Sequence, residues 1–126
     1  MKDIPYQSIF NILQEVLPEN WRKVVFYAEY AQSSYSMKYY VKVSDGNYTD
    51  CFQLNGIPKR KVINAFANID KQIMSVRKDL NKKDLWSVMT LIVDTSGGFK
   101  ADFEYDDILD DQMSFIRKWK EKYLSK

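Results

Sequence analysis

The side chains of this sequence that could do chemistry are carboxylates, and they gather near its carboxyl end. Residues 101–112, which we call the acidic segment, hold six acids and no Lys or Arg. Asp102, Glu104 and Asp106 alternate with aromatic residues, which on a strand places three carboxylates on one face about 6.5 Å apart. Such a row attracts a metal ion or the basic side chains of a partner. The six acids are Asp102, Glu104, Asp106, Asp107, Asp110 and Asp111.

Three interpretations of the acidic segment follow from these residues. The first is a solvated strand face that runs into the acidic start of a helix, where the helix dipole favours Asp. The second is a calcium loop, because Asp102, Glu104 and Asp106 match the opening of an EF-hand loop. Asp107 in place of the required glycine and Met113 in place of the closing Glu argue against it. The third is a docking surface for a basic protein. Composition does not decide between the first and the third.

Most other catalytic and metal-binding chemistry lacks the necessary side chains. The chain has no His and one Cys, Cys51, which excludes Ser-His-Asp and Cys-His nucleophiles and zinc sites built from thiolate and imidazole. The four glycines form neither a Walker loop nor a dinucleotide fingerprint. An enzyme that works through carboxylates alone is the one catalytic alternative left. We therefore expect neither catalysis nor a cofactor.

The chain carries no signal for export or membrane insertion. A lone Cys cannot form an intramolecular disulfide, which favours a reducing compartment. The amino-terminal MKDIPYQSIFNILQEV contains an acid and a proline where a signal peptide needs a basic start and an unbroken apolar run. No stretch approaches the ~20 apolar residues of a membrane helix. These observations predict a cytoplasmic protein without membrane contact.

The spacing of apolar residues predicts the elements that must position the acidic segment. Apolar residues recur at steps of three and four in the expected helices and at every second position in the expected strands. The order α-β-β-β-α-β-β-α predicts an α+β fold, a single domain with an antiparallel sheet of about five strands packed against helices. The expected elements are a helix at 6–17, strands at 22–31, 35–43 and 48–54, a helix at 59–81, strands at 86–94 and 99–105, and a helix at 110–124.

Caps and turns support these boundaries. Asp3 can cap the first helix, with Pro5 in its first turn and Pro18 after its end. Asp45-Gly46 is the strongest hairpin signal, between the second and third strands. The turn TSGG at 95–98 joins the last two strands. Asp110 or Asp111 can cap the last helix.

A second functional interpretation rests on basic residues. The net charge of +2 hides an asymmetry, because a basic stretch at 113–126 follows the acidic segment. The expected helix at 59–81 also carries several Lys and Arg residues. This distribution allows a small regulatory module that binds nucleic acid through the helix and the carboxyl-terminal faces. No nucleic-acid-binding motif accompanies it.

Four stretches carry a resemblance to a known family: LPENW, VVFYAE, DLWSVMTLIVDTSGGFKADFEYDDI and KWKEKYL. In this order and spacing they resemble the YezG-type immunity proteins, which are antitoxins of bacterial polymorphic toxin systems. The resemblance covers nearly the whole chain, although the strand meander is shorter here than in longer members and the chain ends soon after the last helix. The positions that match the family pattern are Trp21, Glu29, Trp86, Gly98, Phe99, Asp102, Phe103, Tyr105, Asp106 and Trp119.

The resemblance implies a function that the periodicities alone do not. Proteins of this type bind and neutralise the nuclease domain of a toxin delivered by a secretion or contact-dependent system, and they lack enzymatic activity. Residues 1–126 would form one immunity-protein-like domain. The partner would be the carboxyl-terminal domain of the cognate toxin, with no small-molecule substrate, no membrane and no direct nucleic acid. The expected partner contacts are Glu29, Asp102, Glu104, Tyr105, Asp106, Asp107, Asp110 and Asp111.

Overall fold

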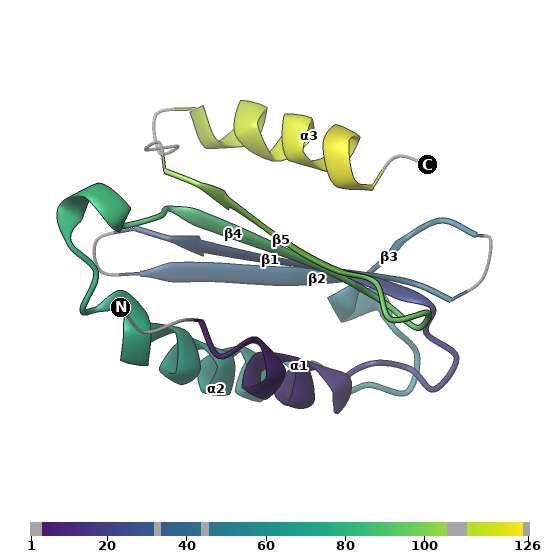
Figure 1. Ribbon diagram of the computed structural model, residues 1–126. Helices are drawn as coiled ribbons and strands as arrows, with labels where there is room; N and C mark the ends of the chain where they lie inside the picture. The colour runs from purple at the N-terminus through teal and green to yellow at the C-terminus, as the bar shows by residue number, and fades with distance from the viewer. Residues whose placement is uncertain (1–3, 32–33, 44–45, 106–110, 125–126) are drawn as a thin grey trace.

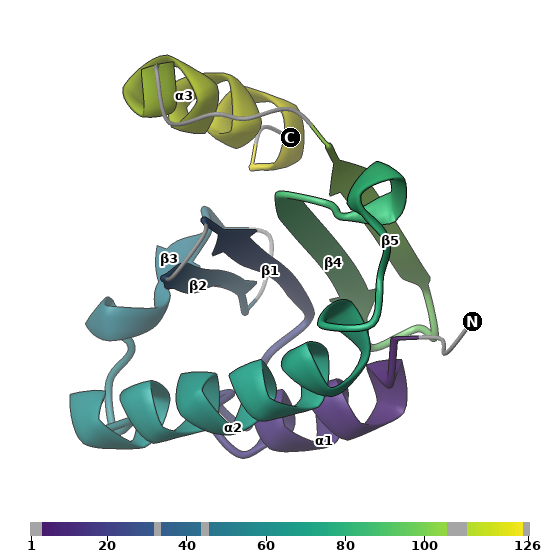
Figure 2. The ribbon, with the colours of Figure 1, turned by 90° about the vertical axis from the view of Figure 1, so that its left-hand side faces the viewer.

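A five-stranded antiparallel sheet lies between two layers of helix (Figures 1 and 2). The computed structural model describes residues 4–31, 34–43, 46–105 and 111–124. Helices α1 and α2 lie side by side on one face of the sheet, and α3 covers the other face (Figure 2). The predicted α+β fold and order of elements are confirmed. The elements are α1 (Tyr6–Gln14), β1 (Lys23–Tyr30), β2 (Tyr35–Lys42), β3 (Thr49–Asp50), α2 (Lys59–Arg77), β4 (Val88–Asp94), β5 (Phe99–Glu104) and α3 (Gln112–Tyr123), with short 3₁₀ helices η1 (Cys51–Gln53) and η2 (Lys82–Asp84).

The strands lie in the order β3-β2-β1-β4-β5, and β1 is central. Its whole length pairs with β2 on one side, and Lys23 to Glu29 pair with β4 on the other. The two hairpins predicted from the sequence, β2–β3 and β4–β5, therefore lie on opposite sides of β1. This order places β5, which carries the start of the acidic segment, at an edge of the sheet.

Each face of the sheet has its own apolar core, because side chains alternate along a strand. Phe26 and Tyr39 face α1 and α2, and they pack with the buried Ile69 of α2 in the larger core. Val25 and Tyr27 face α3 and pack against Trp119 in a smaller core. The sheet is thus buried on both sides. This explains why seven of the eight residues of β1 are buried.

Helices α1 and α2 begin near the expected residues and end earlier than the apolar spacing predicts. Helix α1 ends at Gln14, and Pro5 takes its N-cap position without a side-chain hydrogen bond. Asp3 lies outside the described residues. Helix α2 ends at Arg77, although the apolar pattern continues to Leu80. In both cases apolar residues beyond the last helical turn still contact the core. Periodicity alone therefore overestimates the helix length.

The third strand is far shorter than predicted. Only Thr49 and Asp50 pair with β2, where the sequence predicts a strand at 48–54. The Asp50 carboxylate accepts a hydrogen bond from the Phe52 amide at 2.9 Å and from Lys38 Nζ at 3.0 Å, which turns the chain into η1. Cys51 is fully buried in the larger core. The chain therefore leaves the sheet after Asp50, which caps η1, and Cys51 enters the core. Asp45 of the expected turn lies outside the described residues.

The turn between β4 and β5 is organised by Asp94. Its Oδ1 accepts hydrogen bonds from the Ser96 amide, the Ser96 hydroxyl and the Gly98 amide, at 2.9, 2.6 and 2.8 Å. These bonds hold the pKa of the Asp94 carboxyl below its usual value. Gly97 has φ +98°, which favours glycine, and a Cβ at Gly98 would lie 2.3 Å from Asp94 Oδ2. Asp94 and the two glycines together set where β5 begins.

Candidate partner-binding surface

Helix α3 covers the face of the sheet toward which the acids of β5 point. Ala101 and Phe103 pack against the larger core, so the alternating Asp102 and Glu104 lie on the α3 side. The Tyr123 hydroxyl of α3 donates a hydrogen bond to Asp102 Oδ2 at 2.8 Å. Lys100 Nζ lies 3.7 Å from the same oxygen, and the Asp102 side chain is 28% exposed. Asp102 therefore has partners within the chain and serves to hold α3.

Glu29 also lies under α3. It is 6% exposed and faces the smaller core from β1. Its Oε2 accepts a hydrogen bond from Gln112 Nε2 at 2.7 Å, and its Oε1 accepts one from the Tyr27 hydroxyl. Burial, and then the bond to Glu29, raise the pKa of Tyr27 well above its ordinary value. Both carboxylate oxygens are thus engaged by intramolecular donors. In this structure Glu29 positions the start of α3.

A third polar contact lies between the other two along α3. Trp119 Nε1 donates a hydrogen bond to Thr90 Oγ1 at 2.9 Å, and both side chains are buried. The Trp119 ring meets Tyr27 edge to face, with ring centroids 5.0 Å apart. Helix α3 is therefore held near its start, middle and end by a side chain of β1, β4 and β5 respectively.

The remaining predicted contacts divide between exposed and undescribed positions. Tyr105 directly follows β5 and is 58% exposed. Glu104 is half-buried, and Asp111 is exposed at the N-cap of α3, where its carboxylate accepts a hydrogen bond from the Ser114 amide at 3.4 Å. The expected Asp111 cap is thus present. The other three predicted contacts, Asp106, Asp107 and Asp110, lie outside the described residues.

The metal interpretation gains no support from the residues described. They contain no group of three or more His, Cys, Asp or Glu side chains placed to hold a metal ion. Asp102, the first ligand of the proposed calcium loop, is instead bonded to Tyr123. Among the helices described, none is both long and apolar enough to span a membrane.

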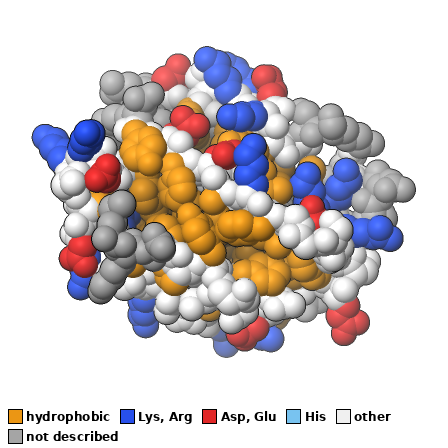
Figure 3. Space-filling view, viewed as in Figure 1, with side chains coloured by type: hydrophobic (Ala, Val, Ile, Leu, Met, Phe, Trp, Pro, Cys, Tyr) orange, Lys and Arg blue, Asp and Glu red, His pale blue; other side chains and the backbone are white. Residues whose placement is uncertain are grey.

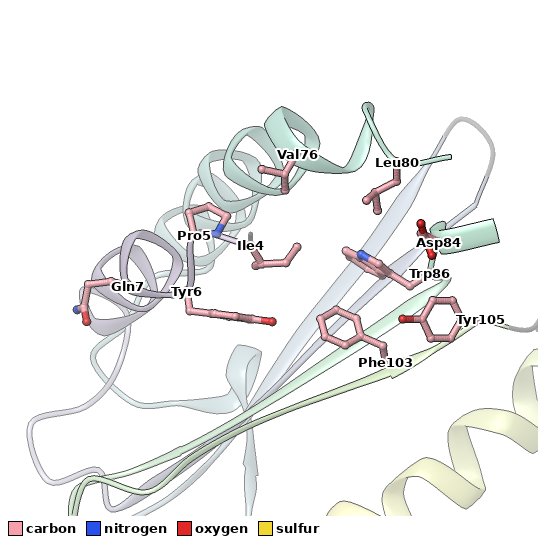
Figure 4. A pocket seen from close by; sticks show the side chains of 10 residues that line it. All are labelled: Ile4, Pro5, Tyr6, Gln7, Val76, Leu80, Asp84, Trp86, Phe103 and Tyr105. Carbon is pink, nitrogen blue, oxygen red and sulfur yellow. The ribbon is translucent and has the colours of Figure 1, made fainter. Parts of the chain in front are cut away.

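An apolar hollow that the sequence did not predict lies on the opposite side of β5. It has a volume of about 620 Å³ and lies between the start of α1, the end of α2 and the last two strands (Figure 4). Its apolar lining comes from segments far apart in the chain, which conceals it from pattern analysis. The signal that could have indicated it is the alternation of aromatic residues along β5. Six of its lining residues are Ile4, Tyr6, Leu80, Trp86, Phe103 and Tyr105.

A second hollow continues the first along the same strand. It has a volume of about 740 Å³ and extends from Tyr6 past Phe10 and Trp21 to Phe99 and the turn after β4. Tyr6 lines both hollows, and its ring meets the Phe99 ring edge to face at 5.2 Å. Phe99 is 53% exposed. Hydrophobic side chains form a band across this face between the two helical layers (Figure 3). We call the two hollows together the β5 groove.

Arg77 packs against Trp86, which forms part of the wall of the first hollow. Its guanidinium lies over the rings of Tyr30 and Trp86, 4.7 and 5.1 Å from their centroids. Arg77 Nη2 donates a hydrogen bond to the Trp86 carbonyl at 2.6 Å. Burial lowers the pKa of Arg77 from its ordinary value. The hydroxyl of Tyr30 is in turn bonded to Asp70 at 2.7 Å. Trp86 is therefore fixed in place at the groove.

Comparison with known proteins identifies one family. Residues 2–125 match the family model described as YezG-like immunity protein. The chain is 29% identical over 117 residues to the immunity protein YezG of Bacillus subtilis (strain 168), covering 86% of this chain and 76% of that protein. It is 23% identical over 117 residues to the immunity protein YezG of Bacillus spizizenii (strain ATCC 23059 / NRRL B-14472 / W23), covering 86% of this chain and 71% of that protein.

Proposed function

The chain belongs to the YezG-like immunity protein family, and from this we propose that it protects its producer by binding and neutralising the nuclease domain of one cognate toxin. The observation that carries the proposal is the meeting of acidic and apolar surface at the carboxyl end of β5. There Glu104 precedes the exposed Tyr105, and Tyr105 also lines the β5 groove. A nuclease presents Lys and Arg to phosphates, so it offers the complementary charge.

The structure changes which acids the proposal uses. Asp102 and Glu29 are bonded to α3, so we assign them to holding that helix. Glu104 and Asp111 remain as described acids with exposed surface at the two ends of the connection between β5 and α3. Asp106, Asp107 and Asp110 join them in the proposal on the strength of the sequence. An acidic surface of this kind steers a basic partner and speeds association.

We further propose that the inhibition is stoichiometric and needs no cofactor. An aromatic residue beside an acidic patch supplies the apolar anchor area that acids alone lack. Delivery of the toxin by a contact-dependent or other polymorphic system is part of the proposal. So is action in the cytoplasm, where a reducing environment would keep the buried thiol of Cys51 unpaired.

The test is a charge reversal with a matched control. The triple variant Glu104→Lys, Asp106→Lys, Asp107→Lys is compared with Glu15→Lys, Glu19→Lys, Asp79→Lys, which makes the same change in net charge at exposed acids elsewhere. Binding is measured to the carboxyl-terminal domain of the cognate toxin, together with protection of growth. We expect the first variant to associate more slowly and to bind about tenfold or more weakly, because steering is lost.

Two outcomes of that experiment would count against the proposal. Equal affinities for both triple variants would leave the acidic segment as a solvated face. Failure of the unmodified chain to bind the toxin domain, together with salt-dependent binding to DNA or RNA alone, would favour the nucleic-acid-binding interpretation.

A further inference from the structure

The two edges of the sheet differ in how much backbone they leave open. On one side, β3 pairs with Tyr40 and Val41 of β2, and Asp50 binds the Lys38 side chain, so one end of β2 is covered. On the other side, β5 has six residues, and no strand among the described residues pairs with its outer edge. Natural sheets usually blunt an edge of that length with charges, bulges, proline or a covering element. Strand β5 carries charges but no proline, and no described strand covers it. Its backbone edge is therefore available to a partner strand.

The register shows which backbone groups of β5 point outward. The Asp94 amide donates to the Gly98 carbonyl at 3.1 Å, in line with the pairing of β4 and β5. Hydrogen-bonded and non-hydrogen-bonded pairs alternate in an antiparallel ladder. Lys100 and Asp102 thus direct their backbone groups to β4. Phe99, Ala101 and Phe103 direct theirs to the open edge, where each offers one donor and one acceptor.

The side chains of β5 make one side of that edge apolar and the other side charged. Phe99 and Phe103 line the β5 groove, while Asp102 and Glu104 lie on the α3 side. Side chains of an added strand would alternate between the same two sides, about 5 Å from their cross-strand neighbours. Those on one side would enter apolar hollows. Those on the other would lie next to Glu104 at the carboxyl end and, further along, next to Lys100, which pairs with Asp102. The edge therefore suits a strand with apolar residues at alternate positions and a basic residue near Glu104.

We propose that the open edge of β5 binds an extended segment of the toxin as a sixth strand, with apolar side chains in the β5 groove and a Lys or Arg beside Glu104. The inference rests on the proposed function, because the toxin supplies the strand. Backbone hydrogen bonds provide affinity in this mode of recognition, and side-chain pockets provide specificity. The hollows and the rigid Trp86 wall are the pockets that such a strand requires.

Amide exchange measured residue by residue by NMR tests the backbone pairing. The probe is the carboxyl-terminal domain of the cognate toxin. In the free chain, the amides of Phe99, Ala101 and Phe103 should exchange faster than those of Lys100 and Asp102. In the complex, the three outward amides should slow about tenfold or more, since they become hydrogen-bonded. If these amides still exchange fast in the complex, the proposed strand addition is wrong, while the proposed immunity function is unaffected.

A variant of the outward-facing Ala101 tests the same point through affinity. Ala101→Pro removes an outward donor without removing a bond to β4, and the control Ala101→Val adds comparable bulk but keeps the amide. Proline is tolerated on an open edge for this reason. We expect the proline variant to bind the toxin domain about tenfold or more weakly than the valine variant. Equal affinities for two folded variants would refute strand addition at this residue.

Two further outcomes are informative. A second copy of this chain could pair along the same edge. Protection of the outward amides that rises with concentration in the free chain, together with a dimer in sedimentation, would replace the toxin strand by a second copy. Loss of folding in Ala101→Pro would leave the exchange experiment as the deciding test. Absence of any complex with the toxin domain would refute the proposed function itself.

Discussion

Tyr123 and Asp102 are joined by a 2.8 Å hydrogen bond that ties the last turn of α3 to the edge strand of the sheet. Burial, and then the bond to Asp102, raise the pKa of the Tyr123 phenol. The most central acid of β5 is thus part of the fold of this protein. A mutation there changes the position of α3 as well as the charge of the surface.

Replacing Tyr123 by Phe should lower the free energy of unfolding by about 1 kcal/mol, the usual net contribution of such a bond. Asp102→Ala should cost a similar amount, because it removes the acceptor of the Tyr123 hydroxyl. In the double variant the two losses should not add, because both remove the same contact. Urea denaturation of the four proteins gives the coupling energy. If Asp102→Ala weakens toxin binding without changing stability, the assignment of Asp102 to holding α3 is wrong.

Thr90→Val should destabilise the protein by about 1–3 kcal/mol, because it leaves the buried Trp119 Nε1 without an acceptor while keeping the side-chain volume. Denaturation followed by tryptophan fluorescence measures the loss. Thr95→Val, at an exposed position of the β4–β5 turn, is the control and should stay within about 0.5 kcal/mol of the unmodified chain. Equal stabilities for the two variants would contradict the role of this hydrogen bond.

Gly98→Ala should destabilise the β4–β5 turn, since the new Cβ would lie 2.3 Å from Asp94 Oδ2 and displace the carboxylate from its three donors. The same substitution should cost much less in an Asp94→Ala background, where nothing is displaced. Thermal unfolding of the two single variants and the double variant measures this difference. Additive losses would mean that Gly98 is needed for another reason.

Burial raises the pKa of the Cys51 thiol to about 11, so the folded protein keeps it neutral where the unfolded chain ionises. An unfolded Cys ionises at about pH 8.5. The Cys51 contribution to stability is therefore present below about pH 8.5 and is lost as the pH rises toward 11. The free energy of unfolding should fall more steeply over this range than in Cys51→Ala. The folded thiol should also react slowly with a disulfide reagent at pH 8. Rapid labelling would contradict its burial.

Tyr105→Ala should weaken binding to the toxin domain about tenfold or more while leaving stability nearly unchanged, because Tyr105 is an exposed aromatic beside the β5 groove. Ile63→Ala, an exposed apolar truncation on α2, is the control. Calorimetry on both variants compares the affinities. A larger effect at Ile63 would move the interface to the outer face of α2.

The alternation of apolar residues predicted the strands of the sheet but overestimated the length of the third strand. Strict alternation in β1 and β2 predicted both strands, and it also fixes their register, because one step would have moved Phe26 and Tyr39 out of the larger core. The end of β3 depends on Asp50 accepting bonds from both Phe52 and Lys38. The bond from Lys38 brings in a neighbouring strand, and hydrophobic alternation carries no information about it.

The candidate surface was predicted only in part for a similar reason. The acids of β5 were expected to share a face, and Asp102 and Glu104 lie on the α3 side. That α3 would cover this face depends on Trp119 and Tyr123 finding Thr90 and Asp102 across the sheet. The β5 groove draws its lining from α1, α2 and the strands. A single stretch of sequence does not indicate such a hollow.

The unequal edges of the sheet limit how many molecules can join through it. Growth into a fibre requires every unit to offer one edge and accept at another. Here β3 pairs with Tyr40 and Val41 of β2, and Asp50 binds the Lys38 side chain, so part of the far edge is already occupied. Occupation of β5 by a toxin strand would leave, among the described strands, the first part of β2 as the remaining edge. The unequal edges would thus disfavour growth of the sheet into a fibre.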